Sequence, residues 1–158
     1  MSMGSSKPEV SEFGSVDPAP PNGSGSFEAW VSVLHDESEP MFQRMRSVFS
    51  LRNHGGPRAI DALSKALVTP SALLKHEIAY VMGQMQEPSA RPHLERMLQD
   101  TKEHVMVRHE AAEALGAIGA HESRSILEAH LRDPNPEVSE SCEVALDLLA
   151  WVESRRFD

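Results

Sequence analysis

The sequence predicts an all-α fold, an α-solenoid of about four stacked helical pairs, from its composition and its internal repeat. Apolar residues make up 40% of the 158 residues, and aromatic residues only 5%. Much of the apolar content is Ala, Leu and Met, which favour helices, whereas β-branched and aromatic residues favour strands. A chain of this length has room for one domain with a real core. The composition therefore indicates one helical domain.

The repeat appears when four apolar positions are aligned. These positions are 31, 33 and 31 residues apart, and they are Leu51, Met82, Leu115 and Leu146. A two-helix unit of this period cannot hide its apolar face alone, so neighbouring units must stack. We therefore expect HEAT-like helical pairs. Gly83 and Gly116 recur at matching positions, where small residues would let helices approach closely.

Apolar periodicity and break residues place the helices in order. The first is expected from Phe27 to about Asp36, and a polar turn is expected over 101–106. The other boundaries fall at Pro40, Gly55-Gly56, Pro57, Thr69-Pro70, Pro88, Pro92, Gly119 and 133–136. The last two helices are expected to carry Ile126, Leu127, Leu131, Val138, Cys142, Val144, Ala145, Leu148, Leu149 and Trp151. Four methionines are expected to fill the core rather than bind metal: Met82, Met85, Met97 and Met106.

The first 26 residues differ in composition from the rest. They hold four Pro, four Gly and seven Ser, and they lack helical periodicity. Such a segment buries little apolar surface, so residues 1–26 are expected to be a flexible tail or linker. The HEAT-like domain is then expected over residues 27–158.

The net charge limits the classes of binding partner, and the cysteine content indicates the cellular compartment. The net charge of −9 argues against nucleic acid and suits a cationic partner. Cys142 is the only cysteine, which excludes an intrachain disulfide and fits a reducing compartment. The sequence contains no run of 18 apolar residues and no signal-peptide core. We therefore expect a soluble cytoplasmic protein that does not interact with membranes.

Two His-Glu dipeptides are the candidate site. His76-Glu77 and His109-Glu110 lie 33 residues apart at matching positions of consecutive units. Side chains from neighbouring stacked helices could converge on one ion off the first helical turn. Two imidazoles and a carboxylate form the facial set typical of non-haem Fe(II), with one carboxylate to spare. The sequence lacks the His-x-x-x-His spacing of zinc proteases.

A structural alternative stands beside the metal site. A His-Glu pair on a solvated first turn is usually a surface pair, with Glu favoured by the helix dipole. Repeats also arise by duplication, so matched residues can persist without function. The remaining histidines have no repeat partner and are expected to be surface or satisfied side chains: His35, His54, His93, His104, His121 and His130.

Longer motifs resemble a known family. They cover 49–53 (FSLRN), 75–84 (KHEIAYVMGQ), 106–118 (MVRHEAAEALGAI) and 140–147 (ESCEVALD). Together with the segment 15–21 (SVDPAPP), they resemble the C-terminal half of deoxyhypusine hydroxylase, over about nine tenths of the chain. Only 14 residues precede this match, so we expect half of an enzyme.

The resemblance implies a HEAT-like solenoid of two halves with a non-haem di-iron centre. The family uses O₂ to hydroxylate deoxyhypusine on translation factor 5A, which would be the partner here. Carried over by motif, His76, His109 and Glu110 are the iron ligands, and Glu77 faces the substrate's amine. No other catalytic residue is implied. A complete site would hold two Fe(II), with one set of ligands in this chain and the rest from a second half-site or a homodimer.

Two other functions remain open from the sequence. A non-catalytic HEAT scaffold could bind a partner without the second half-site. The second alternative is a phycobilin-lyase-type HEAT protein. It stays open because the motif Ala-x-x-Ala-Leu-Gly-Ala-Ile-Gly is widespread in such repeats. The doubled His-Glu pair argues against the latter, since general HEAT repeats do not need it.

Overall fold

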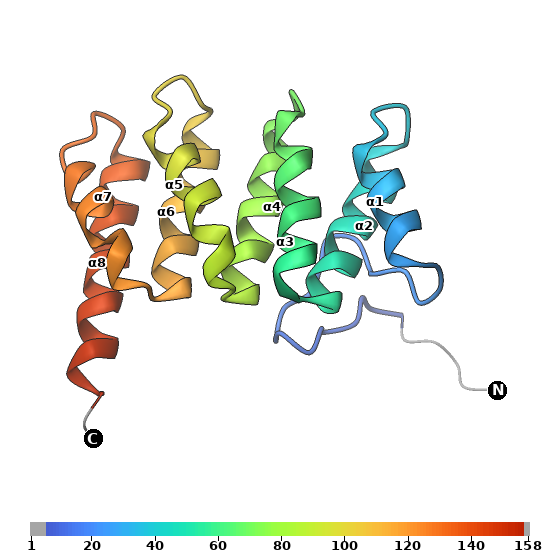
Figure 1. The fold of residues 1–158 in the computed structure, drawn as a ribbon, viewed down its shortest axis with the longest axis horizontal. Helices are drawn as coiled ribbons and strands as arrows, with labels where there is room; N and C mark the ends of the chain where they lie inside the picture. The colour runs from blue at the N-terminus through green and yellow to red at the C-terminus, as the bar shows by residue number, and fades with distance from the viewer. Residues whose placement is uncertain (1–5, 157–158) are drawn as a thin grey trace.

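A computed structural model describes residues 6–156, and this part of the chain forms eight α-helices stacked as four pairs (Figure 1). The first two pairs are α1 (Phe27–His35) with α2 (Met41–His54), and α3 (Gly56–Lys65) with α4 (Ala72–Met85). The last two are α5 (Arg91–Gln99) with α6 (Val105–Ile118), and α7 (Arg124–Ala129) with α8 (Pro136–Ser154). Short 3₁₀ turns lie at Ala66–Val68, Pro88–Ala90 and His121–Ser123. The predicted α-solenoid of about four pairs is confirmed.

The core lies where the second helices of the pairs stack on one another. α4 packs between α2 and α6, and α6 packs between α4 and α8. The aligned residues Leu51, Met82 and Leu115 are fully buried, and Leu146 is partly buried. No helix within residues 6–156 is both long enough and apolar enough to cross a membrane.

Two glycines allow neighbouring helices to approach closely. A Cβ atom added to Gly83 would lie 3.0 Å from Cα of Ala114, and one added to Gly116 would lie 3.0 Å from Cβ of Ala145. Real Cβ atoms essentially never come closer than that distance. The expected close-packing role of both glycines is confirmed, and it brings α4, α6 and α8 together.

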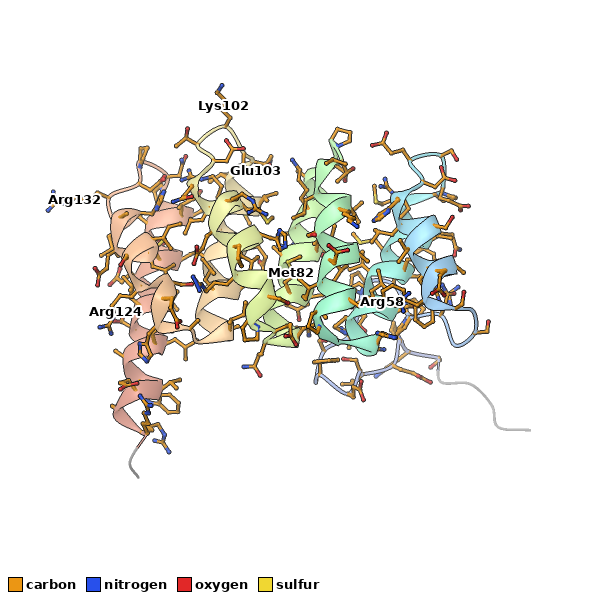
Figure 2. All side chains as sticks on the ribbon, in the orientation of Figure 1. Arg58, Met82, Lys102, Glu103, Arg124 and Arg132 are labelled. Carbon is orange, nitrogen blue, oxygen red and sulfur yellow. The ribbon has the colours of Figure 1, made fainter. Side chains whose placement is uncertain are left out.

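Cationic side chains link neighbouring units. Arg108 is 2% exposed, and its Nε donates to the carbonyl oxygen of Leu98 at 3.0 Å while its guanidinium pairs with the Asp133 carboxylate. Lys75 stands at the matching position of α4, and its Nζ lies 2.9 Å from both carboxylate oxygens of Glu103. Figure 2 labels Glu103 on the loop that follows α5. Each cation thus ties its helix to the loop of the next unit.

The segment before α1 lies against the second helices rather than extending freely. The guanidinium of Arg52 on α2 forms two hydrogen bonds with the Asp17 carboxylate, at 2.7 and 2.8 Å, and both side chains are at most 5% exposed. Gln84 on α4 joins them, accepting from Arg52 at 2.9 Å and donating to Ser15 Oγ at 3.2 Å. Ala19 is 1% exposed. Composition did not indicate these contacts, and the boundary at residue 26 stays a prediction.

The structure differs from the predicted elements in a few places. α6 begins at Val105, so the polar turn is shorter than expected, because His104 already caps the helix through Nδ1. α7 ends at Ala129, which leaves Leu131 outside the helix and 41% exposed. Met82 and Met97 lie in the core as expected and Met85 packs against it, but Met106 is 41% exposed. On α8, Val138, Cys142, Ala145 and Leu149 are buried, whereas Val144, Leu148 and Trp151 are exposed.

Candidate metal site

The two His-Glu pairs occupy the same register in two helices. Ser71 caps α4 by accepting from the backbone N–H of Leu74, and His104 caps α6 in the same role for Met106. His76 and His109 are each the fifth residue after their cap. These caps place both histidines on the second turn of their helices, and the expected position of an ion off the first turn stays a prediction.

The structure links the four predicted residues by a chain of contacts across the boundary between α4 and α6. His76 Nε2 lies 3.1 Å from Glu110 Oε2, and His109 Nε2 lies 3.8 Å from the same oxygen. His76 Nδ1 lies 3.5 Å from Glu77 Oε1. Adjacent residues on a helix point about 100° apart. The longer 3.5 Å separation within this pair is consistent with that divergence.

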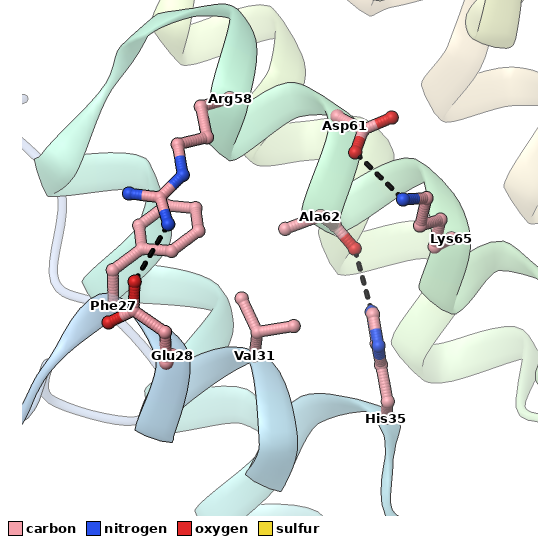
Figure 3. A pocket seen from close by; sticks show the side chains of 8 residues that line it. All are labelled: Phe27, Glu28, Val31, His35, Arg58, Asp61, Ala62 and Lys65. Atoms are coloured by element: carbon pink, nitrogen blue, oxygen red, sulfur yellow. Dashed lines mark hydrogen bonds and ion pairs between the residues drawn. The ribbon is translucent and has the colours of Figure 1, made fainter.

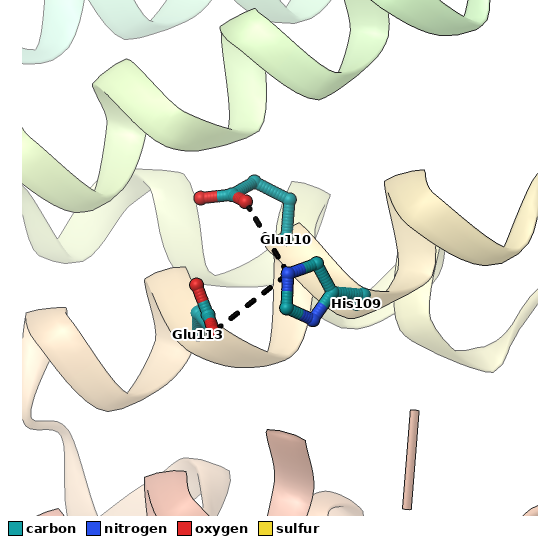
Figure 4. A group of neighbouring side chains, drawn as sticks. All are labelled: His109, Glu110 and Glu113. Atoms are coloured by element: carbon teal, nitrogen blue, oxygen red, sulfur yellow. Dashed lines mark ion pairs between the residues drawn. The ribbon is translucent and has the colours of Figure 1, made fainter. Parts of the chain in front are cut away.

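Sequence reasoning missed one neighbour, Glu113. His109, Glu110 and Glu113 each present a possible ligand atom within 4.8 Å of the others (Figure 4). The Glu113 carboxylate lies 3.7 Å from His109 Nε2 and is 48% exposed. Its four-residue spacing from His109 puts both on one helix face and could have revealed it. The two sets share His109 and Glu110. The set with His76 contains the shorter contact and the less exposed third group.

Burial dominates the electrostatics of the site. It raises the pKa of the Glu77 carboxyl, an effect that His76 opposes and that the negative charge of Asp17 reinforces. Burial likewise raises the pKa of the Glu110 carboxyl. His76 and His109 oppose this increase, whereas the negative charges of Glu113 and Glu77 add to it. Glu77 and Glu110 are thus two partly desolvated carboxyl groups that repel each other when ionised. A divalent cation bound by deprotonated ligands would relieve this repulsion.

A second candidate location lies on the outer layer. A groove of about 400 Å³ lies between α1 and α3, and its lining includes the apolar side chains of Phe27 and Val31 (Figure 3). Its polar groups pair with one another: Arg58 with Glu28 at 2.8 Å, and Lys65 with Asp61 at 3.0 Å. His35 Nε2 lies 2.9 Å from the carbonyl oxygen of Ala62. A groove whose charges are already paired has less to offer a ligand than the His-Glu site.

The other histidines behave as expected for satisfied or surface side chains. His121 pairs with Glu153 on the surface at 2.8 Å, and His130 Nδ1 lies 2.9 Å from the carbonyl oxygen of Ile126. His93 contacts Arg96, and burial together with that cation lowers the pKa of its imidazole. His54 packs against the ring of Phe27.

Known proteins support the resemblance expected from the motifs. Deoxyhypusine hydroxylase of Arabidopsis thaliana is 52% identical over 151 residues, 95% of this chain and 48% of its own length. Deoxyhypusine hydroxylase of Drosophila pseudoobscura pseudoobscura is 51% identical over 127 residues, 80% of this chain and 42% of its own length. The structure of human deoxyhypusine hydroxylase in complex with glycerol superposes with a TM-score of 0.86 at 46% identity, covering 92% of this chain and 50% of that one.

The chain spans about half the length of the curated relatives it matches. The profile of the PBS lyase HEAT-like repeat matches residues 107–133. The profile of HEAT repeats matches residues 27–106, which is half of the chain. Together with the stacked helical pairs, this match shows that the chain belongs to the HEAT repeat family.

Proposed function

We propose that His76, His109 and Glu110 are the protein ligands of one Fe(II). The observation that carries this proposal is the approach of both Nε2 atoms to one carboxylate oxygen, at 3.1 and 3.8 Å. Two imidazoles and one carboxylate are a donor set that suits non-haem iron. The side chain of Glu110 is 10% exposed and its pKa is raised, so a cation at this place would stabilise its ionised form.

The proposed activity is deoxyhypusine hydroxylation, with this chain as half of the site. Relatives of that name at about 50% identity support it. A complete site would hold two iron ions, with the second set of ligands from another half-site or a second copy of the chain. Bound iron would supply the activation of O₂ for the hydroxylation. The proposed substrate is the deoxyhypusine form of translation factor 5A.

Glu77 is the proposed contact for the substrate amine. Its side chain is 13% exposed, and burial raises its pKa, so an ammonium group would pair with it more strongly than in water. Asp17 adds negative potential from the segment before α1. The net charge of −9 suits a cationic side chain. Glu77 would therefore bind and orient the amine beside the metal ligands.

Anaerobic Fe(II) titration of the purified chain tests the ligands. The wild type is expected to bind one iron, and His109→Ala and Glu110→Ala are expected to remove most of it. The matched control is His121→Ala, which breaks an exposed His–Glu pair and should leave iron binding unchanged. Iron content that His109→Ala does not change would sink the proposal.

Binding and turnover of the deoxyhypusine-bearing factor test the activity. In the presence of the other half-site, the chain is expected to support hydroxylation. Glu77→Gln should retain iron and bind the factor roughly tenfold or more weakly, since a hydrogen bond to a charged group contributes about 1.5–3 kcal/mol. Factor binding without iron or hydroxylation would favour the non-catalytic scaffold instead.

A further inference from the structure

Ser141 on α8 occupies the position that Glu110 occupies on α6. Each is the sixth residue after the cap of its helix. Each also reaches back to the histidine of the preceding unit: Glu110 to His76, and Ser141 to His109. Ser141 is 6% exposed, and its Oγ lies 2.6 Å from His109 Nδ1. The fourth unit thus supplies a contact to the candidate site although it lacks the His-Glu pair.

The direction of this hydrogen bond follows from the other partner of the hydroxyl. Ser141 Oγ also lies 2.6 Å from the carbonyl oxygen of Glu137. A carbonyl oxygen can only accept, and a hydroxyl carries a single proton. The Ser141 proton is therefore committed to that carbonyl, and its Oγ accepts from His109 Nδ1–H. In a neutral imidazole with a proton on Nδ1, the other nitrogen bears the lone pair.

That lone pair faces the candidate site. His109 Nε2 lies 3.8 Å from Glu110 Oε2 and 3.7 Å from Glu113 Oε1. A histidine that binds metal through one nitrogen is oriented by the hydrogen bond of the other. On the opposite side of the site, His76 Nδ1 faces Glu77 Oε1 at 3.5 Å. Both histidines therefore have an acceptor near Nδ1, and the serine gives the shorter contact.

We propose that Ser141 is a positioning residue that holds His109 as the Nδ1–H tautomer and presents its Nε2 to the metal. This role rests on the proposed metal site and adds a residue from outside the His-Glu pairs. Ser141 touches neither metal nor substrate. It acts through the ring of His109, and its own orientation comes from the backbone of α8.

The test compares Ser141→Ala with Ser141→Thr and with Ser47→Ala. Threonine keeps the hydroxyl, which can bond the carbonyl four residues back as serine does. Ser47 is the matched control because it is also a buried helical serine, and its Oγ has no hydrogen-bond partner. Two-bond ¹H–¹⁵N spectra of the metal-free proteins at about pH 8, where free imidazole is neutral, report the His109 tautomer. Anaerobic Fe(II) titration measures affinity.

The Nδ1–H tautomer of His109 is expected in the wild type, in Ser47→Ala and in Ser141→Thr. Ser141→Ala is expected to show a mixture of both tautomers. Fe(II) affinity of Ser141→Ala should fall about tenfold or more, the range typical for partners of metal-binding histidines. An unchanged tautomer in Ser141→Ala would overturn the proposal, as would an Fe(II) affinity that this variant leaves unaltered. If the wild type binds no Fe(II), the proposed function fails, and the spectra of the metal-free proteins still decide whether Ser141 sets the tautomer.

Discussion

Nε2 of His76 and Oε2 of Glu110 lie 3.1 Å apart across the boundary between α4 and α6. The contact joins two units of the solenoid, and it involves a buried carboxylate whose raised pKa marks an unfavourable charge. The arrangement proposed to bind a metal ion should therefore reduce the stability of the metal-free chain.

We expect Glu110→Gln to stabilise the metal-free chain while it weakens iron binding. Glutamine keeps the shape of the side chain and removes the buried charge. A gain of about 1 kcal/mol corresponds to a Tm increase of ~2–4 °C in a chain of this length. Thermal unfolding with a chelator measures it, and Glu113→Gln, at a half-exposed position, is the control. A lower Tm for Glu110→Gln would contradict the prediction.

The stability difference between Glu110→Gln and wild type should depend on pH. The folded pKa of Glu110 is raised, so the folded chain binds this proton more tightly than the unfolded chain does. Wild-type stability should therefore recover as the pH falls from neutral through the raised pKa, and the advantage of the variant should shrink. A constant difference between pH 7.5 and 5 would show that Glu110 does not titrate this way.

Arg108→Met is expected to destabilise the fold by about 3–5 kcal/mol, because removing one partner leaves a buried charge uncompensated. Arg108 and Asp133 are 2% and 5% exposed. Burial raises the pKa of Asp133, but hydrogen bonds from Arg108 and Asn135 outweigh this and lower it. The stabilising contribution is thus present above the ordinary pKa of Asp133 and is lost as the pH falls through its lowered value.

Urea unfolding measures the effect of Arg108→Met. The control is Lys65→Met, which removes a helical ion pair that is about two-thirds exposed on both sides. Such a pair contributes about 0.3–0.5 kcal/mol. If Arg108→Met and Lys65→Met lowered the free energy of unfolding equally, burial would not explain the contribution of the Arg108–Asp133 pair to stability.

Gly83→Ala should weaken both the fold and iron binding. The added Cβ would lie 3.0 Å from Cα of Ala114, so α4 and α6 must separate by a few tenths of an ångström. Overpacking of this kind costs about 1–3 kcal/mol. Because His76 and Glu110 sit on these two helices, the separation also moves the proposed ligands apart. Gly23→Ala, where the new Cβ meets nothing within 4 Å, should be neutral in urea unfolding and Fe(II) titration.

Cys142 should be unreactive in the folded chain. The residue is 0% exposed, and burial raises the pKa of its thiol to about 11, with Asp133 adding to the shift. A thiol reagent at pH 8 should therefore label it only after unfolding. Since the unfolded thiol ionises first, this group should also reduce stability as the pH rises from about 9 to about 11. Rapid labelling of the native chain would contradict the burial of Cys142.

Much of the fold could be predicted from the sequence, because the 31–33-residue repeat and the prolines and glycines at helix ends depend only on nearby residues. The register of His76 and His109 was visible for the same reason, since each lies six residues before an aligned apolar position, Met82 or Leu115. Glu113 was missed because its counterpart one repeat earlier is Tyr80, so the repeat gave no signal.

The contacts that close the molecule were harder to predict. The pair between Asp17 and Arg52 joins residues 35 positions apart, and its partners depend on how a segment without periodicity lies on α2. Ser141 stands in a dipeptide that differs from the His-Glu pairs. Its role depends on the distance between α6 and α8, which sequence spacing does not specify.

The repeat carries the His-Glu pair only in its two middle units. Met45-Arg46 stands at this register in α2, and Glu140-Ser141 stands there in α8. Arg46 donates to the carbonyl oxygen of Pro20, so the first unit presents a cation where the second presents a carboxylate. The donor set therefore forms at a single boundary between units. Iron uptake by one chain should accordingly be hyperbolic, and a sigmoidal isotherm would have to arise from association between chains.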